Sequence, residues 1–106
     1  MSAVTVQERV ILHLNEYSGR RPDTYQMPFS TTQEGIATAL GITRAHASIE
    51  LKKLAVKGRV GSILAHTTRA KRKRRTYYLE PCGRSAVPEI NERARKAYVG
   101  GADNAE

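Results

Sequence analysis

The chain has 106 residues and a formal net charge of +8, a length that suits one domain with a modest core and excludes a second, catalytic domain. Its single cysteine excludes an internal disulfide, and no apolar run approaches the roughly 18 residues of a membrane span. Because Glu8 and Arg9 interrupt the N-terminal stretch, it lacks the order of a secretory signal, and we expect a cytoplasmic protein with no membrane partner.

The first predicted element is a helix from about Val6 to Tyr17. Residues 5–8, TVQE, have the form of a capping box, in which the threonine and the glutamate each satisfy a free backbone N–H. The core-facing stripe consists of Val6, Val10, Leu14 and Tyr17, flanked by Ile11. We interpret His13 as a boundary residue rather than a metal ligand, since no cysteine or second histidine stands near it in the sequence.

A loop and a second helix follow. Residues 18–26 form a loop by composition, and Met27 to Phe29 could form a short edge strand. Ser30 and Thr31 compete as N-caps, because Gln or Glu stands three residues after each. Either choice starts a helix near Thr32.

The third predicted helix spans about residues 43–58. Thr43 has the side chain of an N-cap, and Ala47, Leu51, Leu54 and Gly58 then recur at helical spacing. Gly41 leaves room only for a sharp turn between this helix and the preceding one. The two patterns therefore predict a helix-turn-helix motif.

A β-hairpin is expected next. Residues 60–67 and 76–79 are apolar, β-branched and aromatic enough for two strands. Between them, residues 68–75 hold six cations and no acid, so we predict a hairpin tip or a disordered loop in solvent. Tyr77 and Tyr78 alternate, so one should face the core and the other the solvent or the hairpin.

The last predicted helix opens at Pro88-Glu89 and runs to about Tyr98. Its narrow apolar stripe consists of Ile90, Ala94 and Tyr98. This stripe is suited to packing on the first helix or on a second copy of the chain. The organisation is then a domain at 1–88, a C-terminal helix at 89–99 and a disordered tail at 100–106.

In this order the elements predict a winged helix-turn-helix domain. Its fold class is α+β, mainly α, with a three-helix core, a small antiparallel β wing and an extra C-terminal helix.

Two segments carry a narrower resemblance. One is residues 40–44, LGITR, followed by Leu54, Gly58 and Val60; the other is residues 77–83, YYLEPCG. Together they resemble the recognition-helix segment and the return strand of MarR-like winged-helix transcriptional regulators, with Glu80 in place of the usual threonine. The resemblance implies prokaryotic transcription regulation and double-stranded DNA binding by a homodimer. It also implies that the helix after Thr43 enters the major groove and that the wing lies along the backbone or minor groove.

The positive charge is concentrated where this resemblance places DNA. Residues 43–75 hold eleven lysines and arginines against the single acid Glu50, a net charge of +10, whereas the rest of the chain has a net charge of −2. On a surface that only keeps a protein soluble, positive and negative side chains tend to be interspersed. The segregation of positive charge here therefore favours a polyanionic partner.

Burying Ala47, Leu51 and Leu54 turns the opposite face of the third helix outward. The predicted DNA contacts of this helix are Thr43, Arg44, Ala45, His46, Ser48, Ile49, Lys52 and Lys53. Ala45 and Ile49 are suited to thymine methyl groups, and the polar side chains to phosphates or base edges. The predicted contacts of the wing are Arg69, Lys71, Arg72, Lys73, Arg74 and Arg75, which would give affinity that depends strongly on salt.

An alternative is a winged-helix protein-interaction module. It would present Ile49, Val56 and the stripe that includes Ile90 to another protein, while the wing binds RNA non-specifically or nothing. An enzyme is not expected, because the sequence holds no catalytic constellation, metal-ligand spacing or cofactor motif. Cys82 has no histidine near it in the sequence, so we interpret it as a free structural thiol, with a redox-sensing role left open.

Overall fold

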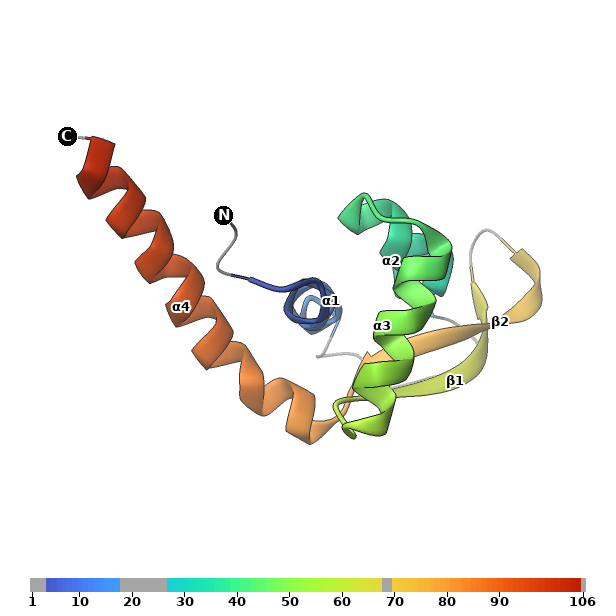
Figure 1. The fold of residues 1–106 in the computed structure, drawn as a ribbon. Helices are drawn as coiled ribbons and strands as arrows, with labels where there is room; N and C mark the ends of the chain where they lie inside the picture. Colours follow the sequence, from blue (N-terminus) through green and yellow to red (C-terminus); the bar gives the residue numbers. More distant parts are fainter. Residues whose placement is uncertain (1–3, 18–26, 68–69, 106) are drawn as a thin grey trace.

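The computed structural model describes residues 4–17, 27–67 and 70–105, with side chains as far as 67 and from 72 to 96. The predicted loop at 18–26 and Arg69 lie outside the described residues. The elements are α1 (Val6–Asn15), the 3-10 turn η1 (Phe29–Thr31), α2 (Gln33–Leu40), α3 (Arg44–Val56), β1 (Val60–Thr67), β2 (Ala70–Leu79) and α4 (Pro81–Ala105). Figure 1 shows the helices packed around one end of the β1–β2 hairpin, with the far end of α4 and the hairpin tip on opposite sides of the molecule.

The capping box of α1 is confirmed. The Glu8 N–H donates to Thr5 Oγ1 at 3.2 Å, and the Thr5 N–H donates to Glu8 Oε1 at 3.0 Å. The helix ends at Asn15, two residues before the predicted end. His13 has the predicted boundary position, since its Nε2 lies 2.8 Å from the carbonyl oxygen of Ser30 and joins α1 to η1.

The start of α2 differs from the prediction. Thr32, rather than Ser30 or Thr31, is the N-cap, and its hydroxyl accepts from the Gly35 N–H at 3.0 Å. The three residues before it form η1, which packs so closely on α2 that a Cβ on Gly35 would lie 2.2 Å from the Phe29 carbonyl oxygen. Ser30 and Thr31 belong to this turn, and the Thr31 hydroxyl donates to the Pro28 carbonyl oxygen, so Thr32 is the residue that caps α2.

The predicted edge strand at Met27 to Phe29 is reduced to a single β-bridge. Met27 pairs with Thr67 in parallel, and its N–H donates to the His66 carbonyl oxygen at 2.9 Å. The strand goes no further because Phe29 already belongs to η1.

The turn of the helix-turn-helix is confirmed. Gly41 has a φ of 68°, a left-handed conformation that favours glycine, and it ends α2. The Thr43 hydroxyl then accepts from the His46 N–H at 3.0 Å and caps α3. The Gln33 side-chain amide donates to the Arg44 carbonyl oxygen at 2.9 Å, so the first turns of α2 and α3 are held together.

The basic segment is a strand over most of its length, so the predicted hairpin tip or loop at 68–75 is wrong for residues 70–75. β1 and β2 pair antiparallel from Val60 opposite Leu79 to Ala65 opposite Arg74, with an irregularity before Thr67 pairs with Ala70. The six cations do not prevent a strand here, because successive side chains of a strand point to opposite faces and the side chains of 72–75 are solvent-exposed.

α4 begins at Pro81 and continues to Ala105, so the predicted start at Pro88 is wrong and residues 101–105 continue the helix where a disordered tail is predicted. Proline is favoured in the first turn of a helix, and Pro81 occupies that place. The division into a domain and a separate C-terminal helix stays a prediction. At 1.5 Å per residue α4 is about 37 Å long, and it contributes to a longest molecular dimension of 52 Å against 26 and 22 Å.

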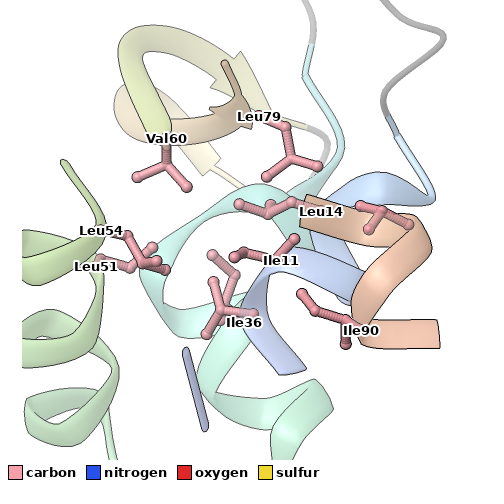
Figure 2. Close-up of a cluster of buried hydrophobic side chains, with 10 residues drawn as sticks. Ile11, Leu14, Ile36, Leu51, Leu54, Val60, Leu79 and Ile90 are labelled. Carbon is pink, nitrogen blue, oxygen red and sulfur yellow. The ribbon is translucent and has the colours of Figure 1, made fainter. Parts of the chain in front are cut away.

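One hydrophobic core joins all four helices and the hairpin. Figure 2 shows its side chains converging from α1, α2, α3, β1, β2 and α4. The buried members are Val10, Ile11, Leu14, Ile36, Leu51, Leu54, Val60, Leu79, Val87 and Ile90. The arrangement confirms the predicted winged helix-turn-helix fold.

Candidate nucleic-acid interface

The outward face of α3 is the one expected from its sequence pattern. Ala47, Leu51 and Leu54 are buried, so the opposite side of the helix faces solvent. Ile49 is 52% exposed and Val56 is 89% exposed. The structure therefore presents the predicted contacts of α3 on the surface, and it divides them between two sides.

On the hairpin side, α3 borders a groove of about 440 Å³. We call this the hairpin groove; it is lined by Gln33, Ser48, Leu51, Lys52, Ala55, Ser62, Arg75 and Tyr77. It brings together three predicted DNA contacts, Ser48, Lys52 and Arg75, from two elements. The Arg75 guanidinium donates to Ser62 Oγ at 2.9 Å, which aims it across the sheet toward α3. No acid is among the lining residues.

Gln33 is a candidate residue that sequence reasoning missed. It is the first residue of α2, and its hydrogen bond to Arg44 places it in the hairpin groove beside Ser48. The signal available in the sequence is its position in the motif, because the first turn of α2 must lie against the first turn of α3.

On the α1 side, α3 borders a second groove of about 510 Å³, lined by residues of the N-terminal turn of α1, of α3 and of α4. His46 lies here, with its Nε2 3.8 Å from Glu50 Oε1, and Lys53 Nζ lies 3.6 Å from the same oxygen. The Glu50 side chain is only 13% exposed. Glu50, the single acid among residues 43–75, therefore offsets positive charge on this side of α3.

An ion pair between α1 and α4 lies at the same groove. Arg93 Nη1 donates to Glu8 Oε1 at 3.0 Å, and Arg93 Nη2 donates to Glu8 Oε2. Hydrogen bonding by Arg93, followed by that of the Thr5 N–H, lowers the pKa of Glu8 to about 2 against the smaller opposing effect of burial. The pair holds α4 against the first turn of α1.

The described wing cations do not share one environment. Arg74 Nη1 lies 3.1 Å from Glu34 Oε2, so Arg74 pairs with the first turn of α2. Arg72 and Lys73 are exposed, and neither has an ion-pair partner among the described side chains of residues 4–17, 27–67 and 72–96. Only the backbone of Lys71 is described, and it belongs to β2.

The two tyrosines of β2 confirm the predicted alternation. Tyr77 packs against the core, and burial raises its pKa. The Tyr78 ring covers Gly61, where a Cβ would lie 2.5 Å from the ring. Burial, followed by the nearby Glu80 carboxylate, raises the pKa of Tyr78. Both rings are only partly buried, and Tyr77 also lines the hairpin groove.

The described residues hold no cluster of three or more His, Cys, Asp or Glu side chains placed to bind a metal ion. Cys82 is exposed and unpaired in the first turn of α4. Of the helices in the described part of the chain, none is long and apolar enough to cross a membrane.

The fold matches solved structures of transcription regulators. MepR, a transcription regulator of the Staphylococcus aureus multidrug efflux pump MepA, matches with a TM-score of 0.66 and 19% identity over 95% of this chain and 65% of that one. The transcriptional regulator PA3341 gives a TM-score of 0.61 and 16% identity, covering 92% and 62% of the two chains. A MepR variant bound to an oligodeoxyribonucleotide matches with a TM-score of 0.65 and 19% identity, covering 93% of this chain and 63% of that one.

These similarities establish the winged-helix fold of MarR-family regulators for this chain. The chain spans less than two thirds of the length of the structures it matches, between 62% and 65% for these three. No protein-family model and no curated protein sequence matches it.

Proposed function

We propose that the chain is a double-stranded DNA-binding transcriptional regulator, or the DNA-binding module of one. The observation that carries the proposal is the hairpin groove, where Lys52 of α3 and Arg75 of β2 face one space with no acid among its lining residues. The solved structures named above, one with a bound oligodeoxyribonucleotide, support the same function. Such a regulator would act in the cytoplasm, and none of its proposed contacts requires catalysis.

In this proposal α3 enters the major groove. Its 13 residues make a rod about 20 Å long, and a B-DNA major groove about 12 Å wide admits such a helix. Thr43 and Arg44 would meet phosphates or base edges at its N-terminal end. Ala45 and Ile49 would contact thymine methyl groups, whereas Ser48 and His46, on opposite sides of the helix, would read base edges.

The remaining cations would bind the DNA backbone. Lys52, Lys53 and Arg75 would meet phosphates beside the major groove, and Arg72 and Lys73 would follow the backbone or enter a minor groove. Arg69 and Lys71 stay sequence-based candidates for the same role.

A salt titration with a labelled duplex tests the proposal. Each phosphate contact contributes about −0.9 to the slope of log affinity against log salt. Five contacts would then lower affinity about 500-fold between about 50 and 200 mM salt. Affinity that does not change with salt, or equal affinity for single strands and duplexes, would contradict the proposal.

Two arginines provide a matched pair for this titration. Arg75→Gln removes a cation of the hairpin groove and should make the slope shallower by about 0.9. Arg84→Gln removes an exposed cation from the first turn of α4, outside that groove, and should leave the slope unchanged. Equal effects of the two substitutions would show that only net charge matters.

We also propose a homodimer through α1 and α4. α4 supports this because its far end extends beyond the helical core (Figure 1). Selection of bound duplexes from a random pool should return a palindromic consensus, since a two-fold dimer binds two half-sites. A consensus without two-fold symmetry would contradict dimeric binding.

The second candidate function is a protein-interaction module. The exposed apolar side chains Ile49 and Val56 favour it, because together they give the outward face of α3 an apolar character. Ile90, which this alternative also presents to a partner, is buried in the core and cannot take part. In that case the chain would show no preference for duplex over single-stranded nucleic acid, and its protein partner would survive nuclease treatment.

A further inference from the structure

We infer that Arg74 is a positioning residue that holds the hairpin against α2 through Glu34, and that it does not contact DNA. The inference rests on the proposed function, in which the other described wing cations bind the DNA backbone. By sequence alone Arg74 is equivalent to its neighbours. The structure separates it from them, because its guanidinium lies 3.1 Å from a carboxylate 40 positions away in the chain.

Strand geometry sends Arg74 and Arg75 to opposite faces of the hairpin. Arg75 faces the hairpin groove, where it donates to Ser62. Arg74 instead borders a separate groove of about 400 Å³ on α2, lined by Phe29, Glu34, Gly35, Thr38, Ala39 and Arg74. Only one of these two adjacent arginines therefore faces the recognition helix.

Arg74 extends an attachment that begins at Thr76, the next residue on the same face of β2. Thr76 is fully buried and forms a β-bridge with Thr32, the N-cap of α2. Glu34 lies in the first turn of that same helix. The Thr76–Thr32 bridge and the Arg74–Glu34 ion pair therefore attach β2 to the first turn of α2 at two successive points. Arg74 makes the attachment nearer to the hairpin tip, so it controls the direction in which Arg72 and Lys73 extend.

Electrostatics also argues against a phosphate contact for Arg74. Arg74 donates a hydrogen bond to Glu34 at 3.1 Å, whereas Lys53 Nζ is 3.6 Å from Glu50 and makes no hydrogen bond to it. A guanidinium that is hydrogen-bonded to a carboxylate has less net charge to offer a phosphate, so it releases fewer counterions when DNA binds. Contacting a phosphate would require Arg74 to leave Glu34, and the uncompensated carboxylate would then stand beside the DNA.

A pure charge effect and a positioning role predict opposite changes in duplex affinity for Glu34→Gln. Removing an acid from a DNA-binding surface raises affinity if charge alone matters. If Glu34 positions the hairpin through Arg74, the same substitution lowers affinity, because the tip cations lose their alignment. We expect Glu34→Gln and Arg74→Gln each to weaken duplex binding by a similar factor, about three- to tenfold, and the double variant to be no weaker than either. The reversed pair Glu34→Arg with Arg74→Glu should restore most of the affinity.

Glu16→Gln is the control for charge, since it removes an exposed acid at the end of α1 and should leave affinity unchanged or slightly raised. Unchanged or raised affinity for Glu34→Gln, or no rescue by the reversed pair, would overturn the inference.

A measurement without DNA separates this inference from the proposed function. Residual dipolar couplings of backbone amides report the orientation of β1 and β2 relative to α2 in the free protein. Glu34→Gln should change that orientation, and the reversed pair should restore it. If the wild-type chain binds no duplex, the proposed function fails, while the couplings still decide whether Arg74 positions the hairpin. Unchanged couplings in both single variants would overturn that role.

Discussion

Replacing Glu8 by glutamine separates the two interactions that this side chain makes. Its carboxylate accepts from the Thr5 N–H in the capping box and from both nitrogens of Arg93 on α4. Glutamine at this position of a capping box can still accept from the cap N–H. Glu8→Gln therefore preserves the cap of α1 and removes the charge that holds α4.

The magnitude follows from the pKa of Glu8, which falls from 4.5 to about 2 in the folded chain. Taken at face value, a shift of this size corresponds to about 3 kcal/mol. The Arg93 side chain is 44% exposed and that of Glu8 is 15% exposed, so solvent screening reduces the contribution to about 1–2 kcal/mol. Because the folded pKa is depressed, this stabilisation is present above pH 4.5 and is lost as the pH falls toward 2.

Urea unfolding between pH 2 and 7 tests the reasoning. Above pH 5, Glu8→Gln should be less stable than the wild type by about 1–2 kcal/mol. The unfolding free energies of the two proteins should converge as the pH falls toward 2, where the Glu8 carboxyl is protonated in the unfolded chain and about half protonated in the folded chain. If the unfolding free energies of Glu8→Gln and the wild type differed by the same amount from pH 2 to 7, the stabilisation could not come from the ionised Glu8–Arg93 pair.

Two further variants control the measurement. Glu92→Gln breaks the exposed pair of Glu92 with Lys96 on α4, whose atoms lie 3.5 Å apart, and should change stability by less than about 0.5 kcal/mol. Glu8→Ala should lose the cap as well, at an additional cost of about 1 kcal/mol that persists at low pH.

Three other substitutions test how the fold positions the site. Gly83→Ala should destabilise the fold strongly or force α4 away from β1 in a crystal structure, because a Cβ there would lie 2.2 Å from the Arg59 carbonyl oxygen. Leu54→Ala, in the fully buried face of α3, should cost about 2–5 kcal/mol in urea unfolding. Thr43→Ala removes the acceptor of the His46 N–H and should cost about 1 kcal/mol in stability; amide exchange should rise in the first turn of α3 rather than throughout the chain.

Features set by local chemistry could be predicted from the sequence. The capping box at Thr5, the cap at Thr43 and the turn at Gly41 each depend on a few consecutive residues, and the structure has all three. The buried stripe of α3 was equally accessible, because helical periodicity alone selects the face that turns inward. These local signals were sufficient to predict the winged-helix fold.

Features set by contacts between distant segments could not be predicted. Thr32 caps α2 because Ser30 and Thr31 belong to η1, and nothing in residues 30–34 alone reveals that turn. The extent of β2 depends on pairing with β1. Its basic residues were expected to leave the sheet, yet Arg74 and Arg75 find separate partners on its two faces. Gln33 was missed for the same reason, since its place in the hairpin groove depends on its bond to Arg44.

The two sides of α3 depend on different neighbouring helices. On the hairpin side, β2 contacts α2 through the bridge of Thr76 with Thr32 and the ion pair of Arg74 with Glu34. On the other side, His46 and Glu50 share a groove with the Glu8–Arg93 pair that holds α4. A displacement of α4 would change the groove that it shares with His46 and would leave the contacts between α2 and β2 in place. Under the proposed function, His46 would then be the DNA contact that depends on the position of α4, and the cations of β2 would be the contacts that depend on α2.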